Sequence, residues 1–181
     1  MDMAKKLLRW FSVNSSVRRL VRMVNGLLDV CLRIWSRLRF GSLVENSHSS
    51  ICHWSTEIKS PENIHIGNHV IIGPHCCLGA MADITIGDYT RISRGVVIET
   101  AGLDLESDLP YSHVAKPITI GRGVWLATNA VILGGVTVGD YAVIGAGVVI
   151  TKDVQPHSIV VGSANRVLGL MPSRGQSGKS V

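Results

Sequence analysis

Histidine is the residue type in this chain best suited to acid–base chemistry, and His113 stands in the most suggestive place. It lies in a polar segment, AGLDLESDLPYSHVAKP at residues 101–117, which interrupts an otherwise regular pattern. An imidazole has an ordinary pKa of about 6.5, so near neutral pH it can accept a proton from a hydroxyl group. Polar excursions from a regular scaffold are where functional residues concentrate. His113 is therefore a candidate general base, the alternative being an exposed loop imidazole without a role.

Other histidines raise the question of a metal site. A catalytic zinc ion needs two or three converging imidazoles and an open coordination position. His48 and His53 are five residues apart but precede the regular pattern, whereas His65, His69 and His75 face mixed directions. The spacing therefore predicts no metal site.

The four cysteines, Cys31, Cys52, Cys76 and Cys77, predict reduced thiols rather than a disulfide framework or a zinc motif. Cys76 and Cys77 are adjacent, so on a strand their side chains point to opposite faces. Nothing nearby would obviously lower a thiol pKa, which disfavours a covalent acyl-cysteine route. Reduced, mostly buried thiols are typical of a cytoplasmic protein.

The element that must position these residues is a six-residue repeat, which runs from about Cys52 to Pro156. Neither a helix nor an alternating strand produces this period. One unit supplies a short strand and a corner, so three units make one triangular coil of about 18 residues. The repeating apolar positions are Ile66, Ile72, Leu78, Ile86, Ile92, Ile98, Ile120, Leu126, Ile132, Val138, Ile144 and Ile150, with a two-residue shift between Leu78 and Ile86.

Stacking such coils buries each apolar residue on its equivalent in the next coil. Glycine often follows the inward residue, as Gly67 follows Ile66, because the chain turns there. The repeat therefore predicts an all-β fold, a left-handed parallel β-helix whose coils pair as in a parallel sheet. The segment 101–117 must leave this prism as a loop and return.

An amphipathic α-helix is predicted before the repeat, from about Asn14 to Arg39. Asn14 or Ser15 can cap its start, and Gly41 is a plausible stop. Its apolar side either contacts a membrane peripherally, with basic residues near anionic lipid, or packs on the body or a neighbouring subunit. The apolar residues at spacings of three and four are Val17, Leu20, Val21, Val24, Leu27, Leu28, Cys31, Trp35 and Leu38.

Charge supports a division of the chain into three parts. The formal net charge is +5, yet residues 1–40 carry nine Lys/Arg against Asp2 and Asp29, so the remaining residues sum to −2. We expect a basic helical arm at residues 1–45, the β-helix at 46–170 and a mobile tail at 171–181. The folded body lacks the basic, aromatic surface of a nucleic-acid-binding protein. No secretory signal and no apolar run of membrane-spanning length is evident, which favours a cytoplasmic location, peripheral to the inner membrane face if the helix binds lipid.

The stretch ITIGRGVWLATNAVILGGVTVGDYAVIGAGVVITKDV, residues 118–154, resembles the hexapeptide-repeat acyltransferase superfamily. Within it, WLAT at residues 125–128 resembles the sugar O-acetyltransferases of exopolysaccharide (colanic-acid-type) and lipopolysaccharide synthesis. The resemblance covers roughly residues 52–170. It implies a homotrimer that uses acetyl-CoA as acyl donor, bound in the groove between two prisms, and a saccharide or other small-molecule acceptor.

The resemblance also implies which residues meet CoA. Trp125 belongs to the WLAT segment, and Ala127, Thr128 and Ala146 would let the pantetheine arm approach the backbone. The phosphates would meet the residues that match the family at Thr151, Lys152 and Arg166. Charge-assisted hydrogen bonds from cations and hydroxyls suit that role, although the Thr-Lys-Asp segment could also be a solvated corner.

The family places its catalytic histidine in a Thr-x-Ser/Thr-His-Asp pattern, and here the matching residues 100–104 read TAGLD. Leu103 occupies the histidine position and Asp104 keeps the place of an orienting carboxylate. Three explanations remain open: His113 acts as the base in a rebuilt loop, His69 or His75 reaches the site from a neighbouring subunit, or catalysis is lost. The γ-type carbonic anhydrases share this fold, but the histidine spacing described above departs from their zinc pattern.

Together these features predict an acetyl-CoA-dependent O-acetyltransferase acting on a hydroxyl of a sugar or polysaccharide precursor. Direct transfer would use His113 as general base, with Asp104 as its partner. The alternative is a CoA-binding or scaffolding β-helix with reduced or lost catalysis.

Overall fold

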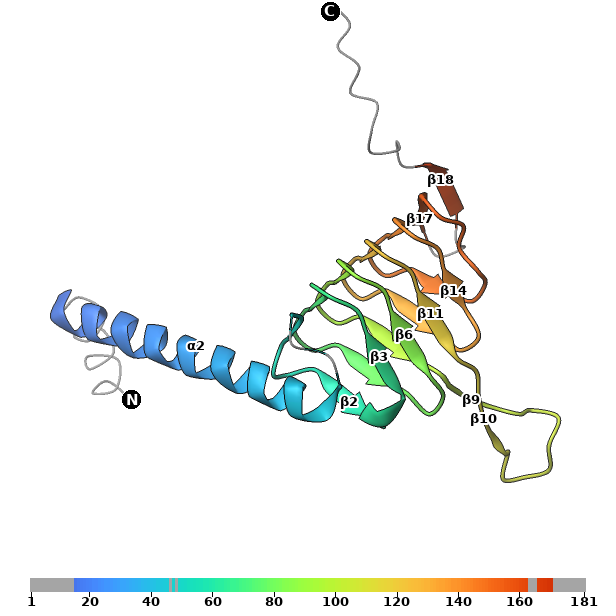
Figure 1. Ribbon diagram of the computed structural model, residues 1–181, viewed down its shortest axis with the longest axis horizontal. Coiled ribbons are helices and arrows are strands. Elements are labelled where there is room, and N and C mark those ends of the chain that lie inside the picture. Colours follow the sequence, from blue (N-terminus) through green and yellow to red (C-terminus); the bar gives the residue numbers. More distant parts are fainter. Residues whose placement is uncertain (1–14, 46, 48, 163–165, 171–181) are drawn as a thin grey trace, which may run out of the picture.

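Short parallel strands form three sheets, which are the three faces of a triangular prism (Figure 1). The computed structural model describes residues 15–45, 47, 49–162 and 166–170. Asn14 as a helix cap, His48 and the predicted tail at 171–181 lie outside these residues. We name the faces A, B and C in the order in which each coil visits them. The prediction of a parallel β-helix is confirmed.

Face A consists of β1 (Ile51–Cys52), β4 (Ile71–Ile72), β7 (Arg91–Ile92), β12 (Trp125–Leu126), β15 (Val143–Ile144) and β17 (Ser158–Val161), with β18 (Arg166–Leu170) antiparallel at its end. Face B consists of β2 (Glu57–Lys59), β5 (Cys77–Gly79), β8 (Val97–Glu99), β13 (Val131–Leu133) and β16 (Val149–Ile150). Face C consists of β3 (Ile64–Ile66), β6 (Ile84–Ile86), β11 (Ile118–Ile120) and β14 (Thr137–Val138). A short 3-10 helix, η1 (Pro61–Asn63), precedes β3.

The core of the prism is the stack of inward residues that the six-residue period predicts. All twelve predicted positions are buried, from Ile66 at 8% exposure to Ile150 at 0%. Backbone hydrogen bonds join successive coils, such as those from Gly67 N to Ile86 O (2.8 Å) and from Gly87 N to Ile120 O (2.7 Å). Each buried isoleucine contributes about 1.5–3 kcal/mol of transfer free energy. The repeat thus forms one continuous apolar core.

Coil length departs from the predicted 18 residues in the first part of the prism. Ile51 pairs with Ile71, which pairs with Arg91, so these coils span 20 residues each. Trp125 pairs with Val143, an 18-residue coil. The extra residues fall at the corner between faces B and C, at 59–63 and 79–83. The excursion at 101–117 leaves from the same corner one coil later, because a corner can lengthen without disturbing the strands on either side.

The glycines after the inward residues have a steric role that differs from the predicted one. A Cβ on Gly87 would lie 2.7 Å from the backbone nitrogen of Arg122 in the next coil. The backbone turns two residues later, where His69, Tyr89 and Tyr141 adopt positive φ of 58°, 59° and 57°. These glycines therefore permit the close approach of coils, and other residues make the turn.

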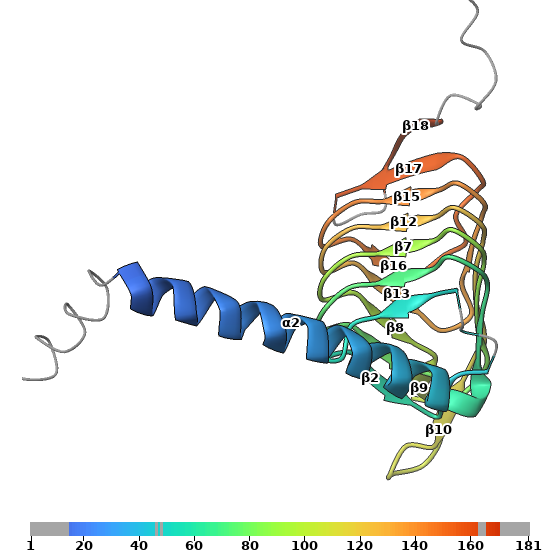
Figure 2. The ribbon, with the colours of Figure 1, turned by 60° about the vertical axis from the view of Figure 1, so that its left-hand side comes forward.

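The helix α2 (Ser15–Leu43) runs past the predicted end at Gly41. Phe40 and Val44 are 2% and 1% exposed and join the core of the prism, so tertiary packing carries the helix through the glycine. The Arg39 guanidinium also donates hydrogen bonds to the Trp54 and Thr56 carbonyls (3.2 and 3.1 Å). The helix projects from the first-coil end of the prism, crosswise to the stacking direction (Figure 2). No helix among the described residues is long and apolar enough to cross a membrane.

Candidate functional site

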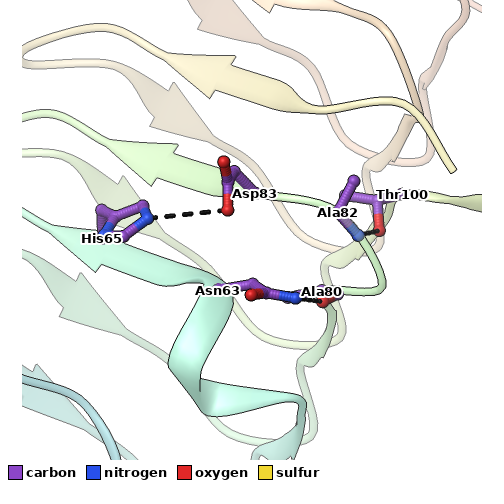
Figure 3. Close-up of polar contacts among 6 residues, drawn as sticks. All are labelled: Asn63, His65, Ala80, Ala82, Asp83 and Thr100. Carbon is purple, nitrogen blue, oxygen red and sulfur yellow. Dashed lines mark hydrogen bonds and ion pairs between the residues drawn. The ribbon is translucent and has the colours of Figure 1, made fainter.

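The corner between faces B and C holds the base of the excursion in a fixed position. Thr100 is 2% exposed, and its hydroxyl donates to the Gly79 carbonyl (2.8 Å) and accepts from the Ala82 N–H (3.0 Å). Below it, the Asn63 amide donates to the Ala80 carbonyl (2.9 Å), as Figure 3 shows. Because one buried threonine joins two coils here, the chain that follows leaves the prism at a defined point.

The excursion itself is a β-hairpin made of β9 (Ala101–Leu103) and β10 (His113–Ala115). Its strands are antiparallel, and His113 lies directly opposite Leu103. Backbone hydrogen bonds from Lys116 N to Thr100 O (3.0 Å) and from Asp104 N to Ser112 O (2.9 Å) surround this pair. Leu103 and His113 therefore form a non-hydrogen-bonded pair, in which the two side chains share one face of the hairpin and lie close together.

Asp104 is held at the turn of the hairpin. Its carboxylate accepts a hydrogen bond from the Glu106 N–H (3.1 Å), and its carbonyl accepts one from the Ser107 hydroxyl (2.8 Å). Side chains alternate along a strand, so the residue after Leu103 belongs to the opposite face of the hairpin from His113. Within one chain, Asp104 and His113 are thus close along the hairpin but on different sides of it.

The other histidines proposed as bases lie at different corners of the prism. His69, between faces C and A, stacks on Tyr89 with ring centroids 5.0 Å apart. His75, between faces A and B, donates its backbone N–H to the Ser55 hydroxyl (3.0 Å). Neither corner carries the hairpin, so only a second copy of the chain could bring these imidazoles to it.

Metal ligands do not converge among the residues that the structure describes, where no group of three His, Cys, Asp or Glu side chains could hold an ion. His65 is on face C, 3.7 Å from the Asp83 carboxylate, while His53 and His75 share the corner between faces A and B. Burial, and then the proximity of His75, lower the pKa of His53.

The three thiols of the prism are poor nucleophiles. Burial raises the pKa of Cys76 and of Cys77 above the ordinary value, and it raises the pKa of Cys52 to about 11. Near neutral pH these side chains are therefore protonated, whereas the attacking species is the thiolate. The Cys76 thiol also donates to the Ser93 carbonyl (3.1 Å), which ties it to the next coil.

The residues assigned to pantetheine form one edge of the prism. Ala127 and Thr128 occupy the corner between faces A and B, and Ala146 occupies the same corner one coil later, where Gly147 N donates to Thr128 O (2.9 Å). Thr128 and Ala146 are exposed. Trp125 lies beside them on face A, half exposed, with its indole N–H donating to the Ser93 hydroxyl (3.1 Å). Small side chains thus line this edge of the prism.

The residues assigned to the CoA phosphates lie elsewhere. Thr151 and Lys152 are exposed at the corner between faces B and C, the corner from which the hairpin leaves two coils earlier. The neighbouring Asp153 carboxylate accepts a hydrogen bond from the Thr137 N–H (2.7 Å). Arg166 pairs with Val161 at the end of the prism, and its side chain lies outside the described residues. One chain therefore presents the predicted CoA residues on two different edges.

Sequence reasoning identified the hairpin histidine but missed its pairing with Leu103 and the role of Thr100 at its base. The pairing depends on the length of the turn between the strands, which no periodic signal reports. The buried threonine could have been suspected, since a polar residue directly precedes the break in the repeat.

Comparison with known protein families finds a match within the six-residue repeat. Residues 117–152 match the family model of the bacterial transferase hexapeptide, six repeats. This segment is a bacterial transferase hexapeptide repeat. A hexapeptide-repeat-containing acetyltransferase from Vibrio cholerae, solved in complex with acetyl coenzyme A, superposes with a TM-score of 0.67 at 27% identity, covering 88% of this chain and 91% of that one.

Two relatives match this chain at higher identity. The galactoside O-acetyltransferase of Escherichia coli is 36% identical over 108 residues, 59% of this chain and 53% of the relative. Nodulation protein L of Rhizobium meliloti is 44% identical over 109 residues, 59% of this chain and 60% of the relative. This chain therefore spans little more than half the length of these two relatives.

Proposed function

We propose that this hexapeptide-repeat protein is an acetyl-CoA-dependent O-acetyltransferase that acts on a hydroxyl group of a sugar or polysaccharide precursor. The likeness to a galactoside O-acetyltransferase and to a structure holding acetyl coenzyme A supports the reaction class. One observation carries the assignment of the base: His113 lies opposite Leu103, the residue at the family's histidine position, on the same face of an exposed hairpin. A histidine on the opposite strand can therefore take the role of the histidine that Leu103 replaces.

In the proposed reaction the His113 imidazole takes the proton of the acceptor hydroxyl as its oxygen attacks the thioester carbonyl. The carbon–oxygen bond forms, and the tetrahedral intermediate then collapses with cleavage of the carbon–sulfur bond. The imidazolium returns its proton to the departing CoA thiolate. Transfer is direct, which agrees with the raised pKa of the Cys76 and Cys77 thiols.

A homotrimer is part of this proposal, because one chain presents the predicted CoA residues on two different edges. Contact between copies would bring the Ala127 edge of one beside the Lys152 edge of another. The outer surface of face B supports such contact, since Cys77, Val97, Val131 and Val149 pair in an apolar column along it. The outer surface of face C instead carries a polar column of His65, Thr85, Thr119 and Thr137.

The test is CoA release from acetyl-CoA over a panel of sugars, comparing wild type with His113→Ala. We expect the variant to lose about a hundredfold or more in kcat, the size typical of a removed general base. His65→Ala is the matched control, because it removes an exposed imidazole from face C and should leave turnover unchanged. Full activity in His113→Ala would instead point to His69 or His75, which the corresponding alanine variants would separate.

The second candidate is a CoA-binding or scaffolding protein without turnover, and Leu103 is the observation that favours it. The CoA-release assay and calorimetric titration with CoA together distinguish the two. CoA binding without turnover on any acceptor would favour a CoA-binding protein that has lost catalysis. An absence of CoA binding would contradict the acetyltransferase and leave the scaffolding protein.

We also infer a cytoplasmic location. All four cysteines of the chain are described, and all are free thiols, as is usual in that compartment. Recovery of the native protein from an extracytoplasmic fraction would contradict this.

A further inference from the structure

Helix α2 is attached to the prism by one side near its C-terminal end. Ser36 and Phe40 are 6% and 2% exposed there, and the neighbouring Arg39 holds two carbonyls of the first coil. The rest of the helix extends beyond the prism (Figure 2). Large apolar side chains along it are exposed by about half or more, among them Leu20 (60%), Leu27 (65%), Leu28 (53%), Ile34 (55%), Trp35 (58%) and Leu38 (65%).

The exposed apolar residues gather on one side of the helix. At about 100° per residue, they cover roughly 200° of the circumference. Ser36 and Phe40 belong to the remaining, polar arc, so the apolar side points away from the prism and cannot pack on it. The polar arc carries five arginines and one acid, Arg18, Arg19, Arg22, Arg33, Arg37 and Asp29.

We propose that α2 lies in the surface of an anionic lipid bilayer, with its apolar side among the acyl chains and its arginines among the headgroups. Three features favour lipid over a second copy of the chain. An apolar arc of about half the circumference suits a half-immersed helix, whereas a helix–helix seam is narrower. The charge is complementary, since arginine dominates the polar arc while residues 41–181 sum to −2.

The third feature is orientation. The helix crosses the first-coil end of the prism (Figure 2). Its apolar side lies opposite Ser36 and Phe40, which are buried against that end, and therefore faces outward. A bilayer parallel to the helix can therefore meet this side without colliding with the coils, which stack away from it. Three copies related by an axis along their prisms would present all three helices to one membrane.

Co-sedimentation of the full chain with vesicles tests the proposal. Wild type should bind vesicles of phosphatidylcholine containing phosphatidylglycerol, with affinity that falls as salt is raised, and should bind pure phosphatidylcholine more weakly. Leu20→Gln/Leu27→Gln should weaken binding about a hundredfold, because each lost leucine is worth roughly tenfold. Both residues are exposed, so the prism should fold normally.

Two further variants separate the contribution of the apolar side chains to vesicle binding from that of the arginines. Asn25→Gln/Gly26→Gln places the same side chains on the polar arc, where a Cβ on Gly26 meets nothing within 4 Å, and should leave binding within about twofold of wild type. Arg22→Gln/Arg33→Gln should weaken binding to the anionic vesicles alone, by roughly fivefold for each charge.

Equal sedimentation of wild type with anionic and neutral vesicles would overturn the proposal. So would a leucine variant that binds vesicles like wild type. If that variant also lost self-association in sedimentation equilibrium, the apolar side would belong to a second copy of the chain.

Discussion

At the scale of single residues, the molecule depends on contacts that a change of one methyl group would disturb. Successive coils approach so closely at Gly87 that backbone atoms of Gly121 and Arg122 occupy the space of a Cβ, each 2.7 Å from its ideal position. Backbone cannot move aside as a flexible side chain can. The glycine is therefore a condition for the regular spacing of the sheets rather than for a turn.

We predict that Gly87→Ala lowers the free energy of unfolding by about 1–3 kcal/mol, the usual cost of forcing an extra group into a packed interior. Gly26→Ala is the matched control, because the space around Gly26 is open and alanine favours a helix by up to about 1 kcal/mol. Urea denaturation followed by circular dichroism measures both. If Gly87→Ala and wild type had the same free energy of unfolding, the coils could move apart at Gly87 without loss of stability, which would contradict the prediction.

At the scale of elements, the hairpin decides where the candidate base lies. Thr100 fixes its base, and antiparallel pairing places His113 opposite Leu103. The sequence predicted a loop carrying a histidine, yet ten residues separate His113 from the family's position along the chain. Because the two strands of the hairpin run side by side, His113 nevertheless lies next to Leu103 in space.

This pairing predicts a cross-strand rescue. In His113→Ala, adding Leu103→His should restore part of the lost CoA release, about tenfold or more, since the new imidazole shares the face of the lost one. The control is His113→Ala with Gly102→His, which places an imidazole on the other face, where a Cβ has ordinary contact with Val114 at 3.8 Å. Equal rescue by both would mean that the face of the hairpin does not matter.

For helix α2, the sequence predicted the element itself correctly but not where the element ends. Its existence and its apolar stripe follow from spacings of three and four. Its end does not, because Gly41 suggested a stop whereas Phe40 and Val44 bury themselves in the prism. The gain from burying these two side chains exceeds the cost of one helical glycine, about 1 kcal/mol.

At the scale of the whole molecule, the three faces of the prism differ in character. Face B presents an apolar column to the outside and face C a polar one, although the same repeat builds both. Exposed apolar columns are typical of surfaces that associate. Contact through face B would bring together the edge that carries Ala127 in one copy and the edge that carries Lys152 in another.

We predict that Val149→Asp, on the outer surface of face B, dissociates the proposed homotrimer into smaller species in sedimentation equilibrium. The reason is that association would bury the new carboxylate without a partner. Thr119→Asp adds the same charge to face C and should leave the trimer intact. A wild type that sediments as a monomer would contradict the trimer itself, and dissociation by Thr119→Asp alone would move the contact to face C.

The sequence by itself determined the β-helix and its inward residues, from Ile66 to Ile150, because a fixed period places equivalent side chains in register whatever the surroundings. It also located the break at 101–117 and the helix before the repeat. Only the tertiary structure decided what these parts present to one another. The pairing of His113 with Leu103, the coil length at residues 59–63 and 79–83, and the outward apolar side of α2 all depend on contacts between residues far apart in the chain. Periodicity reports the environment of a residue within its own element, whereas these contacts arise between elements.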